Sequence, residues 1–554
     1  MKKSILALGA AALFGGLGFA GSAQAVAFFG DAGNDNHFTA PATTGMAQAT
    51  GLELNPGGLG HVLFVPYYSA QGNMSTMFNI TNTDMVNGKA VKVRFRGAAN
   101  SDDVLDFTVM LSPGDVWSAS VVAEGGVATL HTQDSSCTLP AAVDGLVFNP
   151  LRLDSKLSAD AQALHVNEGY IEILNMADVP KNLWTDAVAP AVPVYSGTAS
   201  DLYATIKHKA HGTPVCDSTI LNSTDGKLTD PYMGTRAEAF AAGLGAPTGQ
   251  LMASYAVLAL DQVATYGGSA TAIRAVDATG ANARGNIVYS PQLQDDFGDV
   301  AGIKAYTGDP LLRNGTLKPL WYDLPDMSTP LVTNDIAVYA AFGGDGQLTA
   351  EDAPLIQADT WLANALSKGT VINDWIQNDA KGWQTDWVVS QPTRRYYAAV
   401  DYSTGGIVWN ADMTGVSSVD TTTSAPATAL LNRYRVLKAQ KQGDLGTYAC
   451  MQLTWTGYDR EENSNAVSGS TSASPGAVVL NLNCGEVYTI TFGNQASKVL
   501  QAKITNQTIN SLSLGEAGWG VVTLGGNLPA VGFSATSAPY YGGNIGYTIP
   551  HRWN

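Results

Sequence analysis

Alternation of apolar and polar residues is the dominant pattern of this chain from about residue 60 onward. The run 89–96 is the clearest case. Its apolar and basic residues fall on opposite faces of the predicted strand: Val91, Val93 and Phe95 on one, and Lys92, Arg94 and Arg96 on the other. Side chains of a strand alternate between its two faces, so this run predicts a sheet with one apolar and one basic face. The basic stripe is a candidate for binding an acidic polymer, although such a stripe is more often the solvated side of a sheet.

Similar alternating or fully apolar runs recur along the chain, separated by turns rich in Gly, Pro and Asn. They cover residues 61–122, reappear at 169–175 and 251–258, and dominate again between 385 and 504. Short helices are predicted at 158–164, 202–209, 235–242 and 353–366. Period-two runs between such turns are typical of antiparallel β-sandwiches. We therefore predict a mainly β protein with two or more antiparallel, Ig-like β-sandwich domains and short helical insertions.

The N-terminus has the three-part layout of a secretory signal peptide. Lys2 and Lys3 form a basic head, residues 5–20 are apolar, and Ser22–Ala25 is a small-residue ending of the A-x-A type. This layout predicts cleavage after Ala25 and export of the mature chain. Residues 1–25 are therefore assigned to the signal peptide.

The remaining chain divides into an arm and two folded regions. Residues 26–58 lack periodicity and are predicted to form a flexible N-terminal arm. Residues 59–300 are predicted to form a β-sandwich domain with a mixed helical insertion. Residues 301–554 are predicted to form a second mainly β domain, with a short helical segment near 353–366.

Composition and charge narrow the classes of partner. The chain is 45% hydrophobic and only 14% charged, with 30 basic and 47 acidic residues and a net charge of −17. Such a chain repels nucleic acid, so no nucleic-acid partner is expected. Its acidic excess suits divalent cations such as calcium, or serves solubility alone. No second apolar run approaches the roughly 20 residues of a membrane-spanning helix, so no transmembrane segment is expected.

Four cysteines are placed as two couples that are local in the sequence: Cys137 with Cys216, and Cys450 with Cys484. Four cysteines allow three pairings, and an even number in an exported chain favours disulfides. We predict the local pairing, because each bridge would then tie together one domain. A zinc site is the weaker interpretation, because the chain has no C-x-x-C motif.

Acidic clusters are weak candidates for calcium sites. Asp295, Asp296 and Asp299 lie in one Gly-containing loop. Asp345 and Asp352 match the fifth and closing positions of an EF-hand loop, but its first and third positions would be occupied by residues without side-chain oxygen, Ala341 and Gly343. A capped turn leading into the helix near 353 explains the same residues, and we favour it.

Motifs of common enzymes are missing from the sequence. It contains no G-x-S-x-G elbow, no H-E-x-x-H zinc motif and no P-loop. His208 and His211 have i, i+3 spacing but no third ligand can be named. The carboxylates of Asp459, Glu461 and Glu462 would suit a glycosidase only if two of them faced each other at the right separation. No catalytic residue is assigned.

Several segments resemble a family of large exported proteobacterial surface proteins, some of them S-layer-type. These segments are HVLFVPYYSAQGNMSTMFNITNT, KAVKVRFRGAANSDDVLDFTVMLSPGDVWSASV, TDWVVSQPTRRYYA, YDREE, NCGEVYTITFG and LPAVGFSA, which run in order from about residue 60 to the C-terminus. The resemblance implies a cell-envelope role and supplies no enzymatic residues.

Together these observations predict a non-enzymatic structural subunit, secreted to the outer surface of a Gram-negative bacterium. It would self-associate into an S-layer or higher oligomer, with no cofactor unless calcium binds, and cell-surface polysaccharide is a candidate partner. Two alternatives stay open. One is a carbohydrate-binding adhesin that uses exposed Trp and Tyr residues, and the other is a secreted glycoside hydrolase.

Overall fold

The computed structural model describes most of the chain outside its N-terminus and its middle. The described residues are 49–185, 194–209, 212–229, 240–277, 279–285, 362, 365–394, 398–402, 405–409, 436–461, 464–466, 481–493, 496–509, 514–540 and 543–553. In this part of the chain the fold is mainly β, with several antiparallel sheets and few helices. The predicted fold class is therefore confirmed, while the finer Ig-like assignment stays a prediction.

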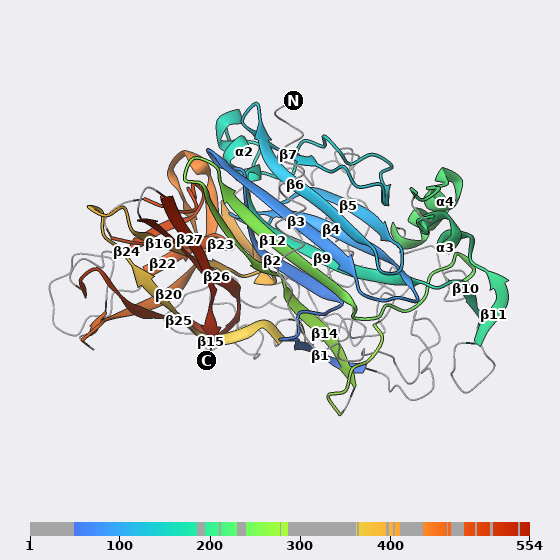
Figure 1. Cartoon of the computed structure of the whole chain (residues 1–554). Helices are drawn as coiled ribbons and strands as arrows, with labels where there is room; N and C mark the ends of the chain where they lie inside the picture. The colour runs from blue at the N-terminus through green and yellow to red at the C-terminus, as the bar shows by residue number, and fades with distance from the viewer. Residues whose placement is uncertain are drawn as a thin grey trace.

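Two sheets of the N-terminal half face each other as a first sandwich (Figure 1). The order of its seven-stranded sheet is β1 (Ala49–Leu54), β14 (Thr271–Asp277), β2 (Val62–Ser69), β9 (Glu168–Val179), β4 (Gly88–Gly97), β5 (Asp103–Leu111) and β8 (Cys137–Leu139). The order of its five-stranded sheet is β13 (Ala264–Ser269), β12 (Leu251–Ala259), β3 (Met74–Asn82), β6 (Val116–Glu124) and β7 (Val127–His131).

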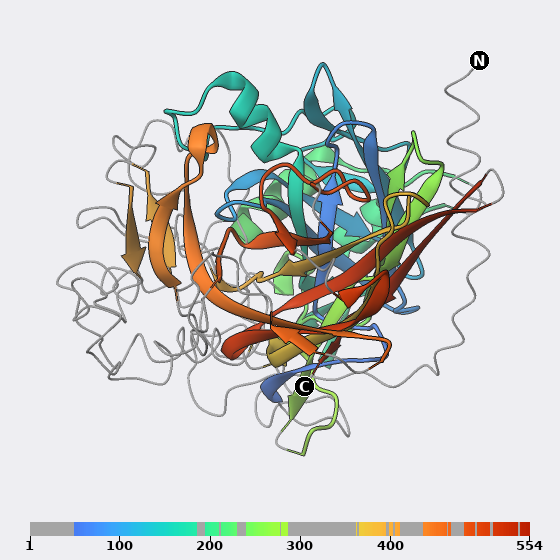
Figure 2. The same ribbon diagram turned by 90° about the vertical axis from the view of Figure 1, so that its left-hand side faces the viewer.

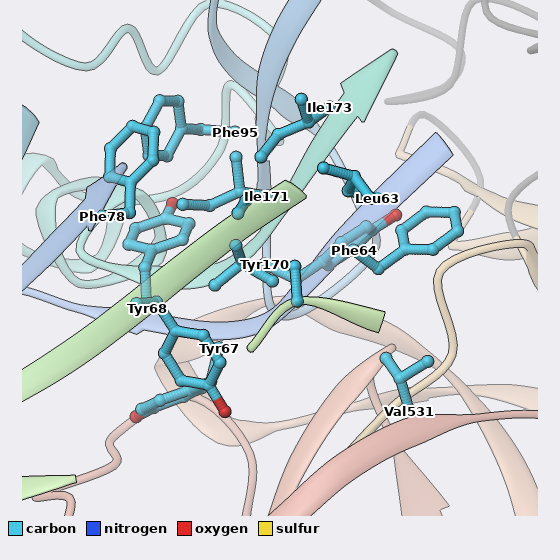
Figure 3. Close-up of a cluster of buried hydrophobic side chains, with 14 of the residues drawn as sticks. Leu63, Phe64, Tyr67, Tyr68, Phe78, Phe95, Tyr170, Ile171, Ile173 and Val531 are labelled. Carbon is cyan, nitrogen blue, oxygen red and sulfur yellow. The ribbon is translucent and has the colours of Figure 1, made fainter. Parts of the chain in front are cut away.

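Apolar side chains of the alternating strands meet between these two sheets. Phe78 of β3 packs edge-on against Phe95 of β4, with ring centroids 5.6 Å apart. Tyr68 of β2 packs edge-on against Phe95 at 5.3 Å. Figure 3 shows these rings together with Ile171 and Ile173 of β9. The face of β4 that carries Val91, Val93 and Phe95 is thus the core face, as its pattern predicted.

The C-terminal half forms a second sandwich beside the first (Figure 1), and this second sandwich faces the viewer in Figure 2. The order of its larger sheet is β19 (Val436–Lys441), β20 (Thr447–Asp459), β25 (Ala517–Pro529), β15 (Ser367–Ile376) and β28 (Arg552–Trp553), with β21 (Ser464–Ala466) and β22 (Asn481–Cys484) also paired to β20. The order of its facing sheet is β24 (Asn506–Ile509), β23 (Val487–Phe492), β16 (Gln384–Ser390), β26 (Val531–Tyr540) and β27 (Gly543–Pro550). Among these, β23 and β24 are parallel.

Short elements decorate the two sandwiches. The helices are α2 (Ala159–Val166), α3 (Asp201–Ile206), α4 (Ser218–Thr229) and the 3-10 turn η4 (Gly443–Leu445), and the two-stranded hairpins are β10 (Asn182–Thr185) with β11 (Val194–Ala199) and β17 (Ala398–Asp401) with β18 (Gly406–Trp409). Ser158 caps α2 by accepting a hydrogen bond from the Ala161 amide, as predicted. Within the described residues, no helix has both the length and the apolar character needed to cross a membrane.

One segment of the predicted arm is ordered instead. Residues 49–54 form β1, which pairs with β14 along the edge of the seven-stranded sheet. The 26–58 arm assignment is therefore wrong for this stretch, because a strand can join a sheet edge without showing strict alternation. The boundary expected near residue 300 and nearly all of the helix expected at 353–366 lie outside the described residues.

The basic face of β4 is not solvated as its sequence pattern suggested. Lys92, Arg94 and Arg96 are fully buried. Lys92 contacts the carboxylate of Asp106, and Nε of Arg96 lies 3.3 Å from Oε2 of Glu172. The register explains the pairing, because β5 and β9 flank β4 and set acidic residues beside its basic ones. Alternation identifies residues that share a face, but it does not say whether that face is covered.

Candidate functional site

The two sandwiches meet at a junction where apolar and charged groups are buried together. Buried apolar side chains of both sandwiches belong to one continuous cluster. Figure 3 includes Val531 of β26 in the same close-up as Phe64 of β2. The junction also brings together carboxylates, a guanidinium group and tyrosine hydroxyls from both halves, and these are the most unusual buried groups of the molecule.

Glu486, next to β23, is the centre of one half of this junction. Its carboxylate accepts a hydrogen bond from Ser101 of the first sandwich, and Oε1 lies 3.2 Å from Nε of Arg394. Its backbone amide donates to the carbonyl of Ala98 at 2.9 Å. Glu486 and Arg394 are both almost completely buried. Arg394 and Glu486 both belong to the second sandwich, and the hydrogen bonds with Ser101 and Ala98 tie their ion pair to the first sandwich.

Asp102 and Tyr402 form the other half of the junction. The Tyr402 hydroxyl donates to Oδ2 of Asp102 at 2.6 Å, and Nδ2 of Asn100 donates to the same hydroxyl at 3.1 Å. Burial raises the pKa of Asp102 to about 7, with the Glu486 charge adding to the rise and the Tyr402 hydrogen bond opposing it. This carboxyl therefore changes its protonation state near neutral pH.

Glu168, the first residue of β9, binds the segment between β23 and β24 of the second sandwich. Its Oε2 accepts hydrogen bonds from the backbone amides of Lys503 at 2.9 Å and Ile504 at 3.2 Å. Burial raises the pKa of Glu168, while these amide donors oppose the rise. Nearby, Nε2 of His165 lies 2.9 Å from the carbonyl of Leu445. These hydrogen bonds cross the interface and tie the two sandwiches together.

A cleft of about 980 Å³ opens where the edges of the two sandwiches approach each other. Gly546 of β27 marks the approach, because a Cβ added there would lie 2.9 Å from the Cβ of Ala264 in β13. The polar lining includes Asp261 and Gln262 from the first sandwich and Gln384, Lys498, Ser537, Tyr540 and Asn544 from the second. Tyr540 is 57% exposed.

Gln384, one of the residues that line this cleft, has a side-chain oxygen whose hydrogen-bonding capacity is not satisfied in the described part of the chain. The residue is only 6% exposed, and its Oε1 has no hydrogen-bond partner among the residues that the structure describes. A buried amide oxygen without a donor is costly unless a ligand or water reaches it. An exposed aromatic ring, amides and one charge of each sign around an open cleft are the groups that bind a saccharide.

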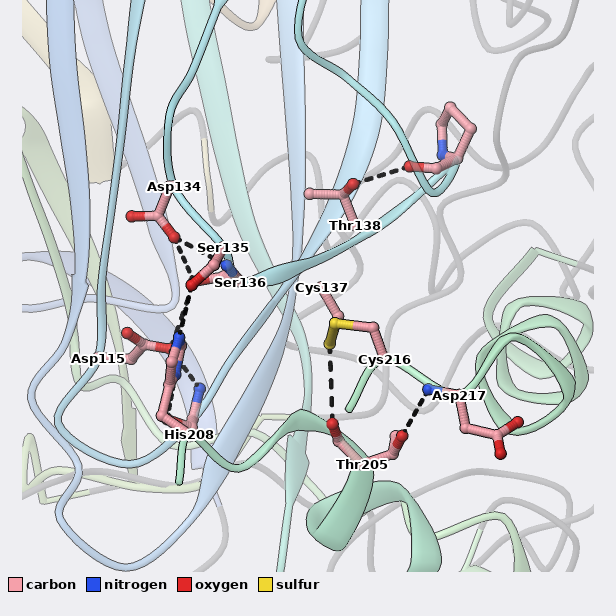
Figure 4. The surroundings of a disulfide bond; sticks show 12 residues. Asp115, Asp134, Ser135, Ser136, Cys137, Thr138, Thr205, His208, Cys216 and Asp217 are labelled. Carbon is pink, nitrogen blue, oxygen red and sulfur yellow. Dashed lines mark hydrogen bonds and ion pairs between the residues drawn. A yellow bond between two sulfur atoms is a disulfide. The ribbon is translucent and has the colours of Figure 1, made fainter. Parts of the chain in front are cut away.

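A smaller pocket of about 320 Å³ lies beside the first disulfide. Cys137 of β8 is bonded to Cys216, which lies 79 residues further along, between α3 and α4 (Figure 4). The second bridge joins Cys450 to Cys484, which face each other across β20 and β22. Both bridges have the local pairing expected from the sequence. Each bridge ties segments of one sandwich.

His208 stands close to the first disulfide between an aspartate and a serine (Figure 4). Its Nδ1 lies 3.2 Å from Oδ2 of Asp115, and its Nε2 lies 3.4 Å from Oγ of Ser135. The order of the three groups is that of a nucleophilic triad, but the serine contact is longer than the usual reach of about 2.6–3.2 Å. Ser112 also approaches Nδ1, at 3.3 Å, and its amide donates to Asp115.

We interpret the His208 cluster as a clamp rather than as a nucleophilic centre. Asp115 collects donors from several loops, including the Ser136 hydroxyl at 3.4 Å. These contacts hold the segment before β8 against the end of α3. The cluster and the disulfide therefore fix the same two segments. Sequence spacing singled out His208 only as a partner of His211, because Asp115, Ser135 and His208 lie far apart in the chain and form no motif.

The acidic calcium candidates of the sequence, Asp295, Asp296, Asp299, Asp345 and Asp352, lie outside the described residues, as does His211. In the described part of the chain, no group of three or more His, Cys, Asp or Glu side chains is placed to hold a metal ion.

The carboxylates proposed for a glycosidase lie at the end of β20. Oδ1 of Asp459 accepts a hydrogen bond from the backbone amide of Glu461 at 2.9 Å, which closes a turn. Glu461 is exposed, and Glu462 lies outside the described residues.

The junction and the cleft could not be found from the sequence, because their residues come from strands that are hundreds of positions apart. We compared the chain with protein-family models, with curated proteins and with solved structures, and none of them matches it.

Proposed function

We propose that this protein is a secreted, non-enzymatic structural subunit of the outer surface of a Gram-negative bacterium, and that it self-associates as S-layer-type proteins do. The observation that carries the proposal is the junction. Two sandwiches that are joined by buried hydrogen bonds, such as that from Ser101 to Glu486, and by a continuous apolar core should move as one rigid block. Two disulfides stiffen that block and suit an oxidising location outside the cytoplasm. A rigid block is what a repeating surface array needs.

The hairpin β10–β11 is the part of this block that we assign to contact with a neighbouring subunit. It projects from the first sandwich at the end far from the second sandwich (Figure 1). Gly197, Thr198 and Ala199 of β11 are exposed. A two-stranded hairpin is only marginally stable alone and gains from pairing with another sheet. If one end of each subunit binds the opposite end of its neighbour, the same contact can be repeated from subunit to subunit without forming a closed ring. Such a contact builds an extended array.

Electron microscopy and sedimentation of the purified protein, with and without millimolar calcium, test this function. We expect ordered assemblies from the natural protein. Lysines in place of Thr198 and Ala199 should prevent them, because charged side chains on an edge block strand addition. Ala159→Lys on α2 is the matched control and should assemble normally. A protein that stays strictly monomeric with and without calcium contradicts the proposal.

The proposal that the protein is not an enzyme can be tested separately at the His208 clamp. A fluorophosphonate probe reacts with the activated serine of a triad. We expect no labelling of Ser135 in the folded protein. Labelling that disappears in both Ser135→Ala and His208→Ala would replace the structural proposal with a hydrolase.

A carbohydrate-binding adhesin is the second candidate, and the cleft between the sandwiches favours it. Tyr540 offers a ring face at the cleft and Gln384 offers an amide oxygen without a partner in the described chain. A glycan array should then show a ligand that Tyr540→Ala loses. Tyr547→Ala is the matched control, because Tyr547 is exposed on the neighbouring strand but does not line the cleft. An array without any binding removes this candidate.

A further inference from the structure

Lys89 and Asp178 form a buried pair at one end of the interior of the first sandwich. They lie directly opposite each other on β4 and β9, and both side chains are completely buried. Nζ of Lys89 is 2.6 Å from Oδ1 of Asp178. Thr248, which precedes β12, and Asp84, which follows β3, join this pair from the other sheet. The pair is thus enclosed by both sheets and shielded from water.

The two oxygens of Asp178 have different surroundings. Oδ1 accepts hydrogen bonds from Nζ of Lys89, from the backbone amide of Thr248 at 3.1 Å and from Nδ2 of Asn175 at 3.3 Å. Oδ2 is buried and has no hydrogen-bond partner among the described residues. The three donors on Oδ1 would stabilise a negative charge on that oxygen, as the donors of an oxyanion hole do. No donor in the described chain stabilises a negative charge on Oδ2.

A hydroxyl connects Lys89 to a second carboxylate. Nζ of Lys89 donates to Oγ1 of Thr248 at 2.6 Å, and this hydroxyl donates to Oδ2 of Asp84 at 3.2 Å. Asp84 is also 3.8 Å from Nζ directly. Burial works to raise the pKa of Asp84, but the Lys89 charge and the donors of Asn87 and Val86 outweigh it and lower the pKa. Asp84 is therefore an ionised group at the end of a short proton path from the ammonium.

We propose that Lys89 and Asp178 condense to an intramolecular amide that covalently joins β4 to β9. An amine and a carboxyl that are held in contact in a dry site react as if at a very high concentration, with effective molarities of about 10⁵–10⁸ M for well-oriented groups. Exclusion of water also protects the product from hydrolysis. The pair has the nucleophile, the acceptor, the oxyanion donors and the proton path in one place.

The step balances without any other reactant. Asp84 takes a proton from the Lys89 ammonium through Thr248, and the neutral amine then attacks Cγ of Asp178. The C–N bond forms, and the attached nitrogen passes one of its protons to Oδ2, so that the negative charge of the tetrahedral intermediate lies on Oδ1, where the Thr248 amide and Asn175 hold it. Asp84 then returns its proton to Oδ2 through Thr248 and the nitrogen, the bond from Cγ to Oδ2 breaks, and water leaves. Two of the three ammonium protons are in this water, the third stays on the amide nitrogen, and Asp84 is again a carboxylate. Nothing is oxidised or reduced.

Mass spectrometry of the purified full chain, reduced and alkylated, tests the proposal. We expect the intact mass to be lower by one water molecule than the mass calculated for the same mature chain with its four cysteines alkylated. A digest of the denatured protein should contain one cross-linked species with Lys89 and Asp178. Lys89→Arg and Asp178→Ala should restore the full mass, whereas Asp178→Asn should react with loss of ammonia instead of water.

Two further variants separate the condensation from a simple ion pair. Asp84→Asn should slow the loss of water by about a hundredfold or more, because it removes the proton acceptor. Lys92→Arg should keep the loss of water, because Lys92 is another buried lysine beside a carboxylate but is outside the Lys89 cluster. Recovery of Lys89 with a free amine in the denatured natural protein, at the full sequence mass, overturns the proposal even if every variant fails to fold.

Discussion

The first and second sandwiches both have aromatic cores but differ in how many ion pairs they bury. In the second, Trp375 stacks on Phe492 at 5.5 Å, Trp387 meets the same ring at 5.0 Å, and one buried ion pair is described, Arg394 with Glu486. In the first, rings also fill the core, and several ion pairs are buried as well, such as Arg96 with Glu172 on the other face of the seven-stranded sheet. Aromatic burial adds stability, whereas buried ion pairs often add none relative to apolar residues. We therefore expect the charges of the first sandwich to fix register and partners, and the rings of the second to supply stability.

The largest effect should come from the ring core. Trp387 is fully buried, and its Nε1 donates to the carbonyl of Asp374 at 3.0 Å. Trp387→Ala should lower the free energy of unfolding by about 3–5 kcal/mol, because it leaves a large cavity. Denaturant unfolding of the full chain measures this loss. Trp387→Phe should lose clearly less, and equal losses in the two variants would contradict a packing explanation.

Removal of one partner of a buried ion pair should have the next largest effect. Arg96→Ala leaves Glu172 and Asp103 buried without the guanidinium and should cost about 3 kcal/mol or more. Replacing Arg96 by Met together with Glu172 by Leu and Asp103 by Asn should recover most of that loss, because neither carboxylate is then left without a partner. If this triple variant is as unstable as Arg96→Ala in the same unfolding experiment, the ion pairs are stabilising and the contrast between the sandwiches fails.

Protonation at the junction should have a smaller, pH-dependent effect. Burial raises the pKa of Asp102 from 3.8 to about 7 in the folded chain. A carboxyl that holds its proton more tightly when folded stabilises the fold most below pH 3.8, and this contribution is lost as pH rises through about 7. Relative to Asp102→Asn, which cannot ionise, the natural protein should therefore lose stability between these pH values.

Unfolding midpoints of the natural protein and Asp102→Asn, measured across this pH range, check the prediction. The difference between the two proteins is the relevant quantity, because buried histidines titrate in the same experiment. Burial lowers the pKa of His165 to about 4, for example, so its contribution has the opposite pH dependence. A difference that is independent of pH would mean that Asp102 ionises normally.

The smallest effect should come from an exposed pair. Nζ of Lys381 lies 2.9 Å from Oε2 of Glu516, but the two side chains are 49% and 54% exposed. Lys381→Ala should change the free energy of unfolding far less than Arg96→Ala does, because water screens the pair. This variant gives the loss of stability expected for an exposed ion pair, against which the loss in Arg96→Ala can be compared. A loss as large as that of Arg96→Ala would show that burial does not control the effect of a charge in this fold.

Local pattern was enough to predict much of the fold. The alternation in residues 89–96 and 104–111 identified β4 and β5 and the core face of β4, because burial between two sheets imposes a period of two. It could not show that β14 returns to pair with β1, since that pairing joins residues more than 200 positions apart. Local pattern also predicted wrongly that Lys92, Arg94 and Arg96 face solvent, because tertiary packing buries this face of the sheet.

The sites were less accessible to sequence reasoning than the strands. Spacing favoured the cysteine pairing, because the two couples are local in the chain. Asp102, Glu486 and Gln384 carry no motif, and their surroundings depend on how the two sandwiches meet. Lys89 looked like the first residue of an ordinary alternating strand, and only the register with β9 and the return of Thr248 place it beside Asp178.

The close approach of Gly546 to Ala264 also protects the protein from its own edges. β27 and β13 are each the last strand of a five-stranded sheet, and an open last strand invites pairing with other chains. In the docked molecule the two strands lie against each other, and Nδ2 of Asn544 donates across the contact to the carbonyl of Gln262 at 3.2 Å. Either half produced alone would leave its own last strand uncovered, so we expect the separated halves to aggregate where the intact chain stays dispersed or assembles in order.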